Sequence, residues 1–383
     1  MEAQFIFSKF VTGKNFIGRK TETTILSNLL TQGENIVIYD PPKSGKKSLI
    51  QNAFLNMRMN GLTFTVTEVS LLDVRSVADV ALKIASEAMR TAASTPEEYM
   101  DYAGRFLEGT HVVFDPEAYS SHGTILSKSW DLDKEDIKAL LRLPYLIAID
   151  RSQKTYVVIE EFQNVMLTED GELLCSLMEE RLKELTAQEK AICTFIFSGS
   201  RVNAMKEIFE GRKYFYRLVE HMTLGPIDTR DITDYVTRTF LSNGKVIDRE
   251  LMFGVCKLFR NNIWYINHFC FICNALSKGY IIEALLRDAL AEVISIHEPR
   301  FLAIINDLTT FQVQLLRAIL DGHTRFSSAE VISRYSLNSS ANVRRLKDAL
   351  CKKEIVTFDD NDNPIILDPL FEYWVKDYYF KIR

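Results

Sequence analysis

The chain has 383 residues, of which 47% are hydrophobic and 25% are charged, and its formal net charge at pH 7 is -5. This composition is that of an ordinary soluble globular protein, and the length predicts two or three domains. The negative balance argues against a protein whose whole surface coats nucleic acid, so a nucleic-acid contact would have to be regional.

The start of the sequence has no basic segment followed by an apolar one, and no run of about 18 apolar residues occurs anywhere. The sequence therefore predicts a cytoplasmic protein with no membrane contact. Six scattered cysteines suit reduced thiols better than a disulfide framework. Cys270 and Cys273 form a CxxC in an apolar helical run without a second pair of ligands, which favours core packing over zinc or redox chemistry.

The first recognisable unit lies at residues 35–55. A short β-branched run is followed by a turn with two prolines and a glycine, and then by a helical run from near Lys46. Further strand-like runs, separated by helical segments at 76–91 and 172–185, occur at residues 63–69, 156–159 and 194–197. Strands that alternate with helices predict an α/β fold whose parallel sheet is covered by helices on both faces. Residues 95–138 are polar and irregular, apart from a helix start at Thr95.

The pattern changes after Pro226, where strand-like runs vanish and amphipathic helical patterns dominate. Asp228 or Thr229 can cap the first of these helices. We expect a nucleotide-binding domain at residues 1–226, a helical lid at 227–306 and a third domain at 307–383. This last part carries three helical patterns and two strands joined by a polar turn, the order of a winged helix.

The turn at residues 40–48 has the residue types of a phosphate-binding loop. Such a loop wraps backbone N–H groups around a phosphate, contacts the β- and γ-phosphates with a lysine, and holds Mg²⁺ with a hydroxyl. Gly45 and Lys46 match the G-x-x-x-x-G-K-[ST] pattern, whereas Asp40 replaces its first glycine and Lys47 replaces the serine or threonine. The nucleotide-binding residues predicted in this loop are Pro41, Pro42, Lys43, Ser44, Gly45, Lys46, Lys47 and Ser48.

Two acids end the strand-like run near residue 156. Glu160 is expected at the metal and Glu161 as the general base that polarises the attacking water. The alternative is a solvated strand end with two glutamates. The next run ends in Ser198-Gly199-Ser200, where a hydroxyl, assigned to Ser198, can bond the γ-phosphate or the water; the alternative is a plain Ser-Gly turn.

The order of these motifs resembles the archaeal-type ATPase family within the signal-transduction ATPases with numerous domains, which are relatives of AAA proteins. The resemblance extends over nearly the whole chain. Residues 16–22 resemble the family's opening motif, which implies that Gly18 and Arg19 lie beside the adenine, and residues 157–165 resemble its Val-Ile-Asp-Glu-Phe-Gln-Asn segment. It implies an AAA-like P-loop NTPase that binds ATP or ADP.

Three later segments also resemble the family. Tyr214-Phe215-Tyr216-Arg217 is similar to a stretch whose arginine is a sensor or finger for the γ-phosphate, although Arg217 could equally be a surface cation. Residues 262–265 are similar to a Gly-Asn-Pro-Trp-Tyr motif of the lid, with Ile263 in place of the proline. Residues 368–371, with Trp374, resemble the Asp-Pro-Leu-Phe ending of the C-terminal domain.

Three positions that normally manage the metal have changed, namely Asp40, Lys47 and Glu160. An ammonium at Lys47 repels a nearby Mg²⁺, so we expect weak metal binding. Our hypothesis is that Lys47 pairs with Glu160 or meets the phosphates directly; in the alternative, Lys47 points to solvent and Ser48 takes the metal. The protein would then be a nucleotide-dependent switch with slow hydrolysis, or a nucleotide-binding scaffold without turnover.

The C-terminal domain has a local excess of cations. Arg344, Arg345 and Lys347 lie on the expected recognition helix at 340–352 and could contact DNA. The favoured alternative is a domain that packs on the ATPase, because the tail from residue 371 is rich in aromatic residues. A switch of this kind also implies a protein partner or self-association.

Overall fold

The computed structural model describes residues 5–211 and 213–382. The chain forms two compact units that alternate along the sequence. One unit comprises Met1–Lys20, Pro41–Gln51 and Gly225–Arg383, and the other comprises Thr21–Asp40 and Asn52–Leu224. We call them the lid unit and the sheet unit, and we describe each by itself.

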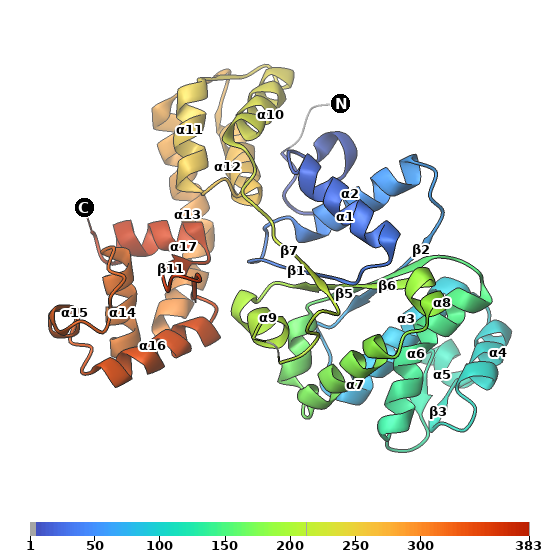
Figure 1. Ribbon diagram of the computed structural model, residues 1–383. Coiled ribbons are helices and arrows are strands. Elements are labelled where there is room, and N and C mark those ends of the chain that lie inside the picture. The colour runs from blue at the N-terminus through green and yellow to red at the C-terminus, as the bar shows by residue number, and fades with distance from the viewer. Residues whose placement is uncertain (1–4, 212, 383) are drawn as a thin grey trace. The chain divides into compact units, whose positions relative to one another are not determined.

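The sheet unit is built on five parallel strands (Figure 1). The strand order is β2-β5-β6-β1-β7. The bounds of the strands are β1 (Ile36–Tyr39), β2 (Thr65–Ser70), β5 (Thr155–Glu160), β6 (Cys193–Gly199) and β7 (Glu220–Met222). The runs expected near residues 36, 63, 156 and 194 are therefore strands, whereas β7 was not predicted.

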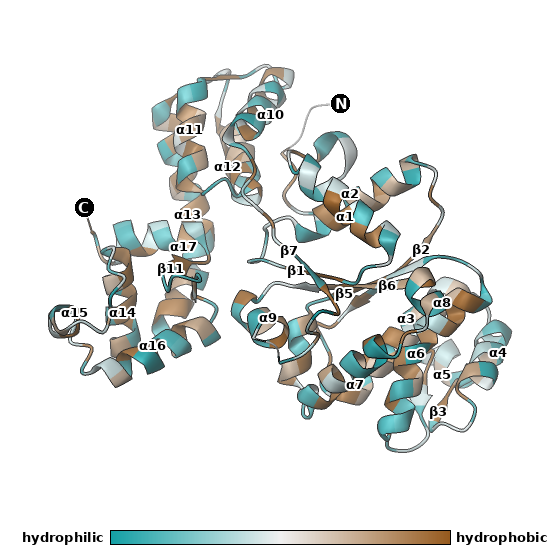
Figure 2. Ribbon diagram, viewed as in Figure 1, coloured by the Kyte–Doolittle hydropathy of each residue, from teal (hydrophilic) through white to brown (hydrophobic). Residues whose placement is uncertain are grey.

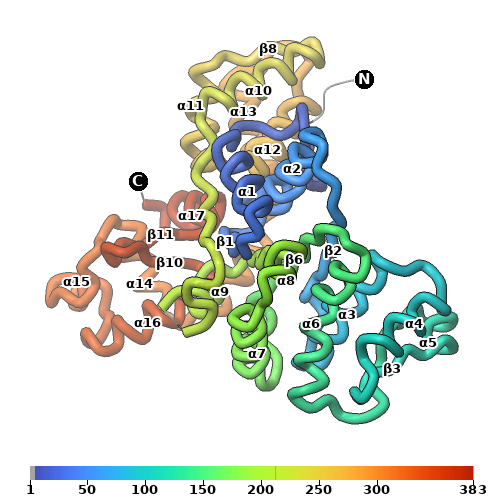
Figure 3. Tube along the Cα trace, turned by 45° about the vertical axis from the view of Figure 1, so that its right-hand side comes forward, coloured from blue at the N-terminus to red at the C-terminus, as the bar shows by residue number. Residues whose placement is uncertain are grey.

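Alternating side chains of β5 face opposite layers of helices. On one face, the Tyr156 hydroxyl donates to the Leu30 carbonyl, and its ring lies 5.5 Å from the ring of Phe54. On the other face, Val157 and Ile159 belong to the hydrophobic core of this unit. Figures 1 and 3 show α1 and α2 on the first face and α3, α6 and α7 on the second, which confirms the predicted covering of both faces.

The helices of the sheet unit include several that the sequence did not predict. Thr95 begins α4 through a capping box with Glu98, as expected for a helix start. Between α4 and α6 the chain forms β3 (Val112–Val113), α5 and β4 (Ser127–Lys128). The helices are α1 (Lys20–Gln32), α2 (Lys46–Met59), α3 (Val77–Ala92), α4 (Pro96–Phe106), α5 (Pro116–His122), α6 (Lys134–Asp150), α7 (Gly171–Lys183), α8 (Ala187–Ile192) and α9 (Val202–Phe209), with a 3-10 turn at Phe162–Leu167. Residues 46–51 of α2 belong to the lid unit.

The part of the lid unit that follows Gly225 opens with helices α10 to α13, which lie together in Figures 1 and 3. They are α10 (Thr229–Ser242), α11 (Arg249–Leu258), α12 (Ile263–Leu276) and α13 (Glu283–Asn306). Alternating teal and brown bands along α10 and α11 in Figure 2 reflect their amphipathic sequences. Two short strands, β8 (Val246–Ile247) and β9 (Tyr280–Ile281), pair in parallel here, in a region expected to be wholly helical.

A winged helix follows α13 in the same unit. Its elements are α14 (Thr310–Leu320), α15 (Ala329–Arg334), α16 (Ser340–Lys352), β10 (Val356–Phe358), β11 (Pro364–Ile366) and α17 (Pro369–Trp374). The antiparallel pair β10 and β11 is the hairpin that the sequence predicted. Phe371 and Trp374 of α17 are buried against Phe301 of α13, so part of the aromatic tail belongs to this unit's own core.

Among the described residues, the structure contains no helix that is both long and apolar enough to cross a membrane. Cys270 and Cys273 are buried in the core of the lid unit. Burial raises the pKa of the Cys273 thiol to about 12, so it stays protonated at neutral pH. Core packing is therefore the role that this structure gives to the CxxC.

Candidate functional site

The predicted phosphate loop connects β1 to α2. The backbone turns through positive φ at Lys43 (+67°) and at Gly45 (+96°). A β-carbon added to Gly45 would lie 3.1 Å from Nη1 of Arg19, so both the backbone angle and the space favour glycine here. Helix α2 begins directly afterwards at Lys46, and the N–H groups of a first helical turn attract anions.

Lys46 reaches back across this loop. Its Nζ donates to the Pro41 carbonyl oxygen at 3.0 Å and lies 3.4 Å from Oγ of Ser44. An ammonium held at the mouth of such a loop is positioned to contact a phosphate group.

Arg19, from the opening motif, fastens the loop to the start of the lid. Its Nη1 donates to the Ser44 carbonyl at 2.8 Å, and its Nη2 donates to the Gly225 carbonyl at 3.2 Å. Gly18 has a φ of +63°, and a β-carbon there would lie 2.7 Å from a methyl of Ile227. Both residues expected beside the adenine therefore contact the lid's first residues.

The two residues that follow Lys46 contact the N-terminal segment. Oγ of Ser48 accepts a hydrogen bond from the Val11 amide at 3.1 Å. Nζ of Lys47 lies 5.8 Å from the centroid of the Phe10 ring. The bond to Val11 gives the Ser48 hydroxyl a structural role that the sequence did not indicate.

The predicted acids lie at the end of β5 in the sheet unit. Glu160 is the last residue of the strand, and Glu161 turns the chain with a φ of +58°, which is uncommon for a residue with a β-carbon. Oε2 of Glu161 accepts from Nε2 of Gln163 at 2.6 Å and from Oγ of Ser200 at 2.5 Å. The acid expected to act as a base is thus oriented by two donors.

Ser200 is a functional candidate that the assignment of Ser198 passed over. Ser198 lies buried within β6, whereas Ser200 follows the strand and contacts Glu161. The glycine between them is required, because a β-carbon at Gly199 would lie 2.4 Å from Met205 and 2.6 Å from Oε1 of Gln163. The sequence Ser-Gly-Ser contains two candidate hydroxyls. They differ in position, because β6 ends at Gly199 and only Ser200 lies beyond the strand.

Arg217 lies in an exposed turn of the sheet unit. Its φ is +60°, and its guanidinium lies 5.1 Å from the centroid of the neighbouring Tyr216 ring. Phe215 is buried among Phe162, Phe197 and Phe209 and anchors this turn. The buried ring of Phe215 therefore fixes the turn to the core, whereas Arg217 is exposed.

The two late motifs of the resemblance are helix N-terminal caps. Asn262 caps α12 by accepting from the amides of Trp264 and Tyr265, so Ile263 occupies the first helical position, where proline is also well tolerated. Asp368 caps α17 in the same way. Its carboxylate also accepts from the Tyr265 hydroxyl at 2.9 Å and from Nη2 of Arg300 at 2.6 Å.

Lys43 extends from the phosphate loop to α12 within the lid unit. Its Nζ lies 3.6 Å from the centroid of the Trp264 ring and 5.5 Å from that of Tyr265. Partial burial, followed by the positive charge of Arg300, lowers the pKa of Lys43 to about 8, although Asp368 opposes this shift.

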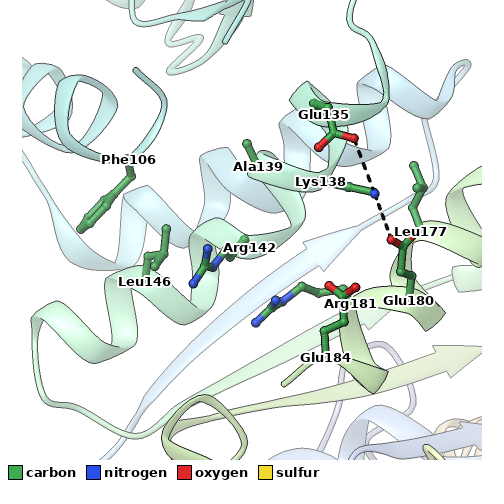
Figure 4. A pocket seen from close by; sticks show the side chains of 10 residues that line it. All are labelled: Phe106, Glu135, Lys138, Ala139, Arg142, Leu146, Leu177, Glu180, Arg181 and Glu184. Atoms are coloured by element: carbon green, nitrogen blue, oxygen red, sulfur yellow. Dashed lines mark hydrogen bonds and ion pairs between the residues drawn. The ribbon is translucent and has the colours of Figure 1, made fainter. Parts of the chain in front are cut away.

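A separate cavity of about 320 Å³ lies in the sheet unit between α4, α6 and α7 (Figure 4). Lys138 bridges Glu135 and Glu180 at its wall, and Arg142 and Arg181 both pair with the buried Glu189. The charges of this wall compensate one another, and none of the predicted site residues lines it.

The cations of the winged helix divide into two groups. Lys347 pairs with Asp362, and Lys353 pairs with Asp307. Arg344 and Arg345 lie exposed on α16. The basic surface offered by α16 is therefore smaller than its sequence implies.

Comparison with known families and structures identifies the architecture. Residues 299–377 match the model of a probable winged helix domain. No curated protein matches the chain.

Two solved structures resemble almost the whole chain. A Walker-type ATPase of Pyrococcus abyssi has a TM-score of 0.65 at 14% identity, covering 96% of this chain and 98% of that one. The Orc2 protein of Aeropyrum pernix, in its ADPNP-ADP complexes, has a TM-score of 0.56 at 14% identity, covering 94% and 93%. The chain thus has the fold of an AAA-like P-loop ATPase with a C-terminal winged helix.

Proposed function

We propose that this protein binds ATP or ADP through its phosphate loop and acts as a nucleotide-dependent switch with slow hydrolysis. One observation carries the proposal: Lys46 and the start of α2 present an ammonium and backbone N–H groups at a loop that turns through a positive φ at Gly45. The β1 strand that precedes the loop ends at the same edge of the parallel sheet as β5, which ends in Glu160.

We propose separate roles for Lys46, Glu161 and Arg217. Lys46 binds the β- and γ-phosphates, and Glu161, oriented by Ser200 and Gln163, takes a proton from the attacking water. Arg217 is proposed to contact the γ-phosphate, as the resemblance implies.

Magnesium fits the donor set poorly. The carboxylate of Glu160 is a suitable oxygen ligand. Lys47, however, occupies the position in the loop that usually supplies the hydroxyl. A metal ion, when bound, would neutralise the phosphate charge; with Lys47 present, we propose that binding needs little metal, and the pairing of Lys47 with Glu160 stays a prediction.

The test is calorimetry with ATP and ADP, each with and without Mg²⁺, on the wild type and on Lys46→Ala. We expect wild-type binding that changes less than about threefold on removing Mg²⁺, and at least a hundredfold loss in Lys46→Ala, because a charge-assisted phosphate contact disappears. Lys183→Ala, on the surface of α7, is the matched control and should bind normally. Absence of binding in the wild type would overturn the proposal.

The alternative within this class is a nucleotide-binding scaffold without turnover. It is separated by measuring phosphate release from the wild type and from Glu161→Gln. Turnover that stops in Glu161→Gln supports the switch, whereas equal rates near background in both proteins support the scaffold. Self-association would be measured by light scattering in each nucleotide state.

DNA binding is a second candidate, favoured by the exposed Arg344 and Arg345 on α16 of a winged helix. Affinity for duplex DNA should then fall steeply with salt. Replacing both arginines by alanine should reduce the slope of log affinity against log salt by roughly 2, because each phosphate contact releases about 0.9 counterions. Arg287→Ala in α13 removes one exposed charge from the lid and should leave the slope unchanged.

A further inference from the structure

Lys43 differs from the other residues of the phosphate loop in where its side chain lies. The backbone takes a φ of +67° at this lysine, a conformation that residues with a β-carbon rarely adopt. From that position the ammonium lies 3.6 Å from the centroid of the Trp264 ring, within the range of a cation–π interaction. The strained backbone and the aromatic contact therefore occur at the same residue.

The surroundings of this ammonium are on balance unfavourable for a positive charge. Arg300 from α13 and the N-cap Asp368 of α17 act on it with opposite signs, and Arg300 has the larger effect. His268 of α12 and His297 of α13 are buried nearby, and burial together with the charge of Lys43 lowers the pKa of both imidazoles. The two imidazoles do not offset the positive charge of Lys43, because an imidazole is either neutral or positive. The nearby carboxylate, Asp368, already accepts hydrogen bonds from Arg300 and Tyr265.

The contact between Lys43 and Trp264 is connected to the winged helix through α12. Trp264 and its neighbour Tyr265 occupy the first turn of α12, whose N-cap is Asn262. The Tyr265 hydroxyl donates to Asp368, which begins α17. A change at Lys43 therefore acts on the start of α12, which is hydrogen-bonded to the start of α17 in the winged domain.

We propose that Lys43 is a positioning residue that alternates between two partners, the Trp264 ring and the polyphosphate of a bound nucleotide, and so transmits occupancy of the loop to α12. This inference rests on the proposed nucleotide binding and adds the element that senses it. A phosphate is the stronger partner, because a charge-assisted hydrogen bond to an anion exceeds a cation–π contact at a solvent-accessible site. Lys43 is an exposed residue of the loop.

The lowered pKa of Lys43 supports the same exchange. Beside Trp264 the charge of Asp368 is outweighed by burial and by Arg300, whereas a phosphate adds a closer negative charge, so nucleotide binding should take up protons above about pH 8. The groups that face it are Trp264, Tyr265 and His268 from α12, His297 and Arg300 from α13, and Asp368 at α17.

The experiment follows Trp264 by its own fluorescence in the full chain. The background variant is Trp130→Phe, which removes an exposed tryptophan and leaves Trp264 and the buried Trp374. ATP and ADP are titrated into this protein and into the same protein carrying Lys43→Met, while calorimetry reports binding independently. Methionine keeps an unbranched, flexible side chain that is one atom shorter and carries no charge.

We expect ATP to change the tryptophan emission of the background protein, and Lys43→Met to reduce this change at least fivefold while still binding ATP. The variant Trp264→Phe should remove the signal and tighten ATP binding about threefold, because phenylalanine is the weaker cation–π partner. It remains informative if Lys43→Met fails to fold.

Two results would overturn the inference. One is calorimetric binding of ATP to the background protein without a change in emission. The other is an undiminished change in Lys43→Met. Absence of binding in the background protein overturns the proposed function as well, so the two failures are distinguishable.

Discussion

At the scale of single residues, the candidate site depends on a few side chains whose neighbours leave them little freedom. Gly45 combines a φ of +96° with a close approach to Arg19, and Glu161 combines a φ of +58° with two donors. Backbone conformations of this kind cost energy and persist where surrounding contacts hold them. Even small substitutions at these positions should therefore change ATP affinity or the rate of phosphate release.

Gly45→Ala should weaken ATP binding at least tenfold and lower the free energy of unfolding by roughly 1 kcal/mol or more, because alanine resists the positive φ and meets Arg19. Calorimetry and urea denaturation measure the two effects. Gly61→Ala is the matched control, since Gly61 has a φ of +84° and open space around it. Equal ATP affinities in the two variants would contradict the assigned role of the loop.

Ser200→Ala should slow phosphate release about tenfold and leave ATP affinity unchanged, because Glu161 loses one of the donors that orient it. Ser198→Ala provides the comparison, as its hydroxyl lies within the buried strand. A larger loss of turnover in Ser198→Ala than in Ser200→Ala would restore the original assignment.

At the scale of elements, helix N-termini join the lid unit together. Asp368 begins α17 and simultaneously accepts from Tyr265 of α12 and from Arg300 of α13. The Asp-Pro-Leu-Phe motif is thus a cap, a first-turn proline and two buried apolar anchors, Leu370 and Phe371. The cap, the first turn and the buried anchors therefore account for the residue types of this motif.

Asp368→Asn should lower the free energy of unfolding by about 1 kcal/mol, because asparagine still caps the helix while the charged partner of the half-exposed Arg300 is lost. Asp368→Ala should lose about 1 kcal/mol more, since the cap also disappears. Urea denaturation measures both. Asp362→Asn, which breaks an exposed ion pair with Lys347, should lower the free energy of unfolding less than either change at Asp368. An equal loss would contradict a special role for the contacts of Asp368 with Tyr265 and Arg300.

The stability of the same region should depend on pH through His297. Burial, together with the charges of Lys43 and Arg300, lowers its folded pKa to about 4, below the usual 6.5. The unfolded state then binds the proton more readily, so stability present above pH 6.5 is lost as the pH falls toward 4. At pH 5 this loss should be about 2 kcal/mol. His297→Gln should flatten the urea-denaturation profile between these values, and an equally steep profile would contradict the assignment.

At the scale of the whole molecule, the sequence predicted the sheet best where strands are buried on both faces. Such strands are continuous apolar runs, as in β5 and β6, whereas β7 at the sheet edge reads Glu-His-Met with two exposed residues and gave no signal. Residues 95–138 contain strands of two residues and a helix of seven, which are too short to establish a periodicity.

The candidate site was predictable only in part. The loop follows β1, and the two acids lie at the end of β5, so both could be predicted from the local sequence pattern. The contact between Lys43 and Trp264 joins distant segments, and the bond between Ser200 and Glu161 depends on where two strands end. Contacts of both kinds are set by tertiary packing, which no local pattern encodes.

The alternation of the two units along the chain limits how the protein can be dissected. A fragment that starts at Gly225 would lack the N-terminal segment and Pro41–Gln51, which belong to the same compact unit. Such a fragment would lose the Phe7 ring that stacks on His268 and the lysine that covers Trp264. Expression of the winged helix and lid alone should therefore give a protein with uncovered aromatic surface and a tendency to aggregate, whereas a protein in which short linkers join all three segments of the lid unit should remain dispersed.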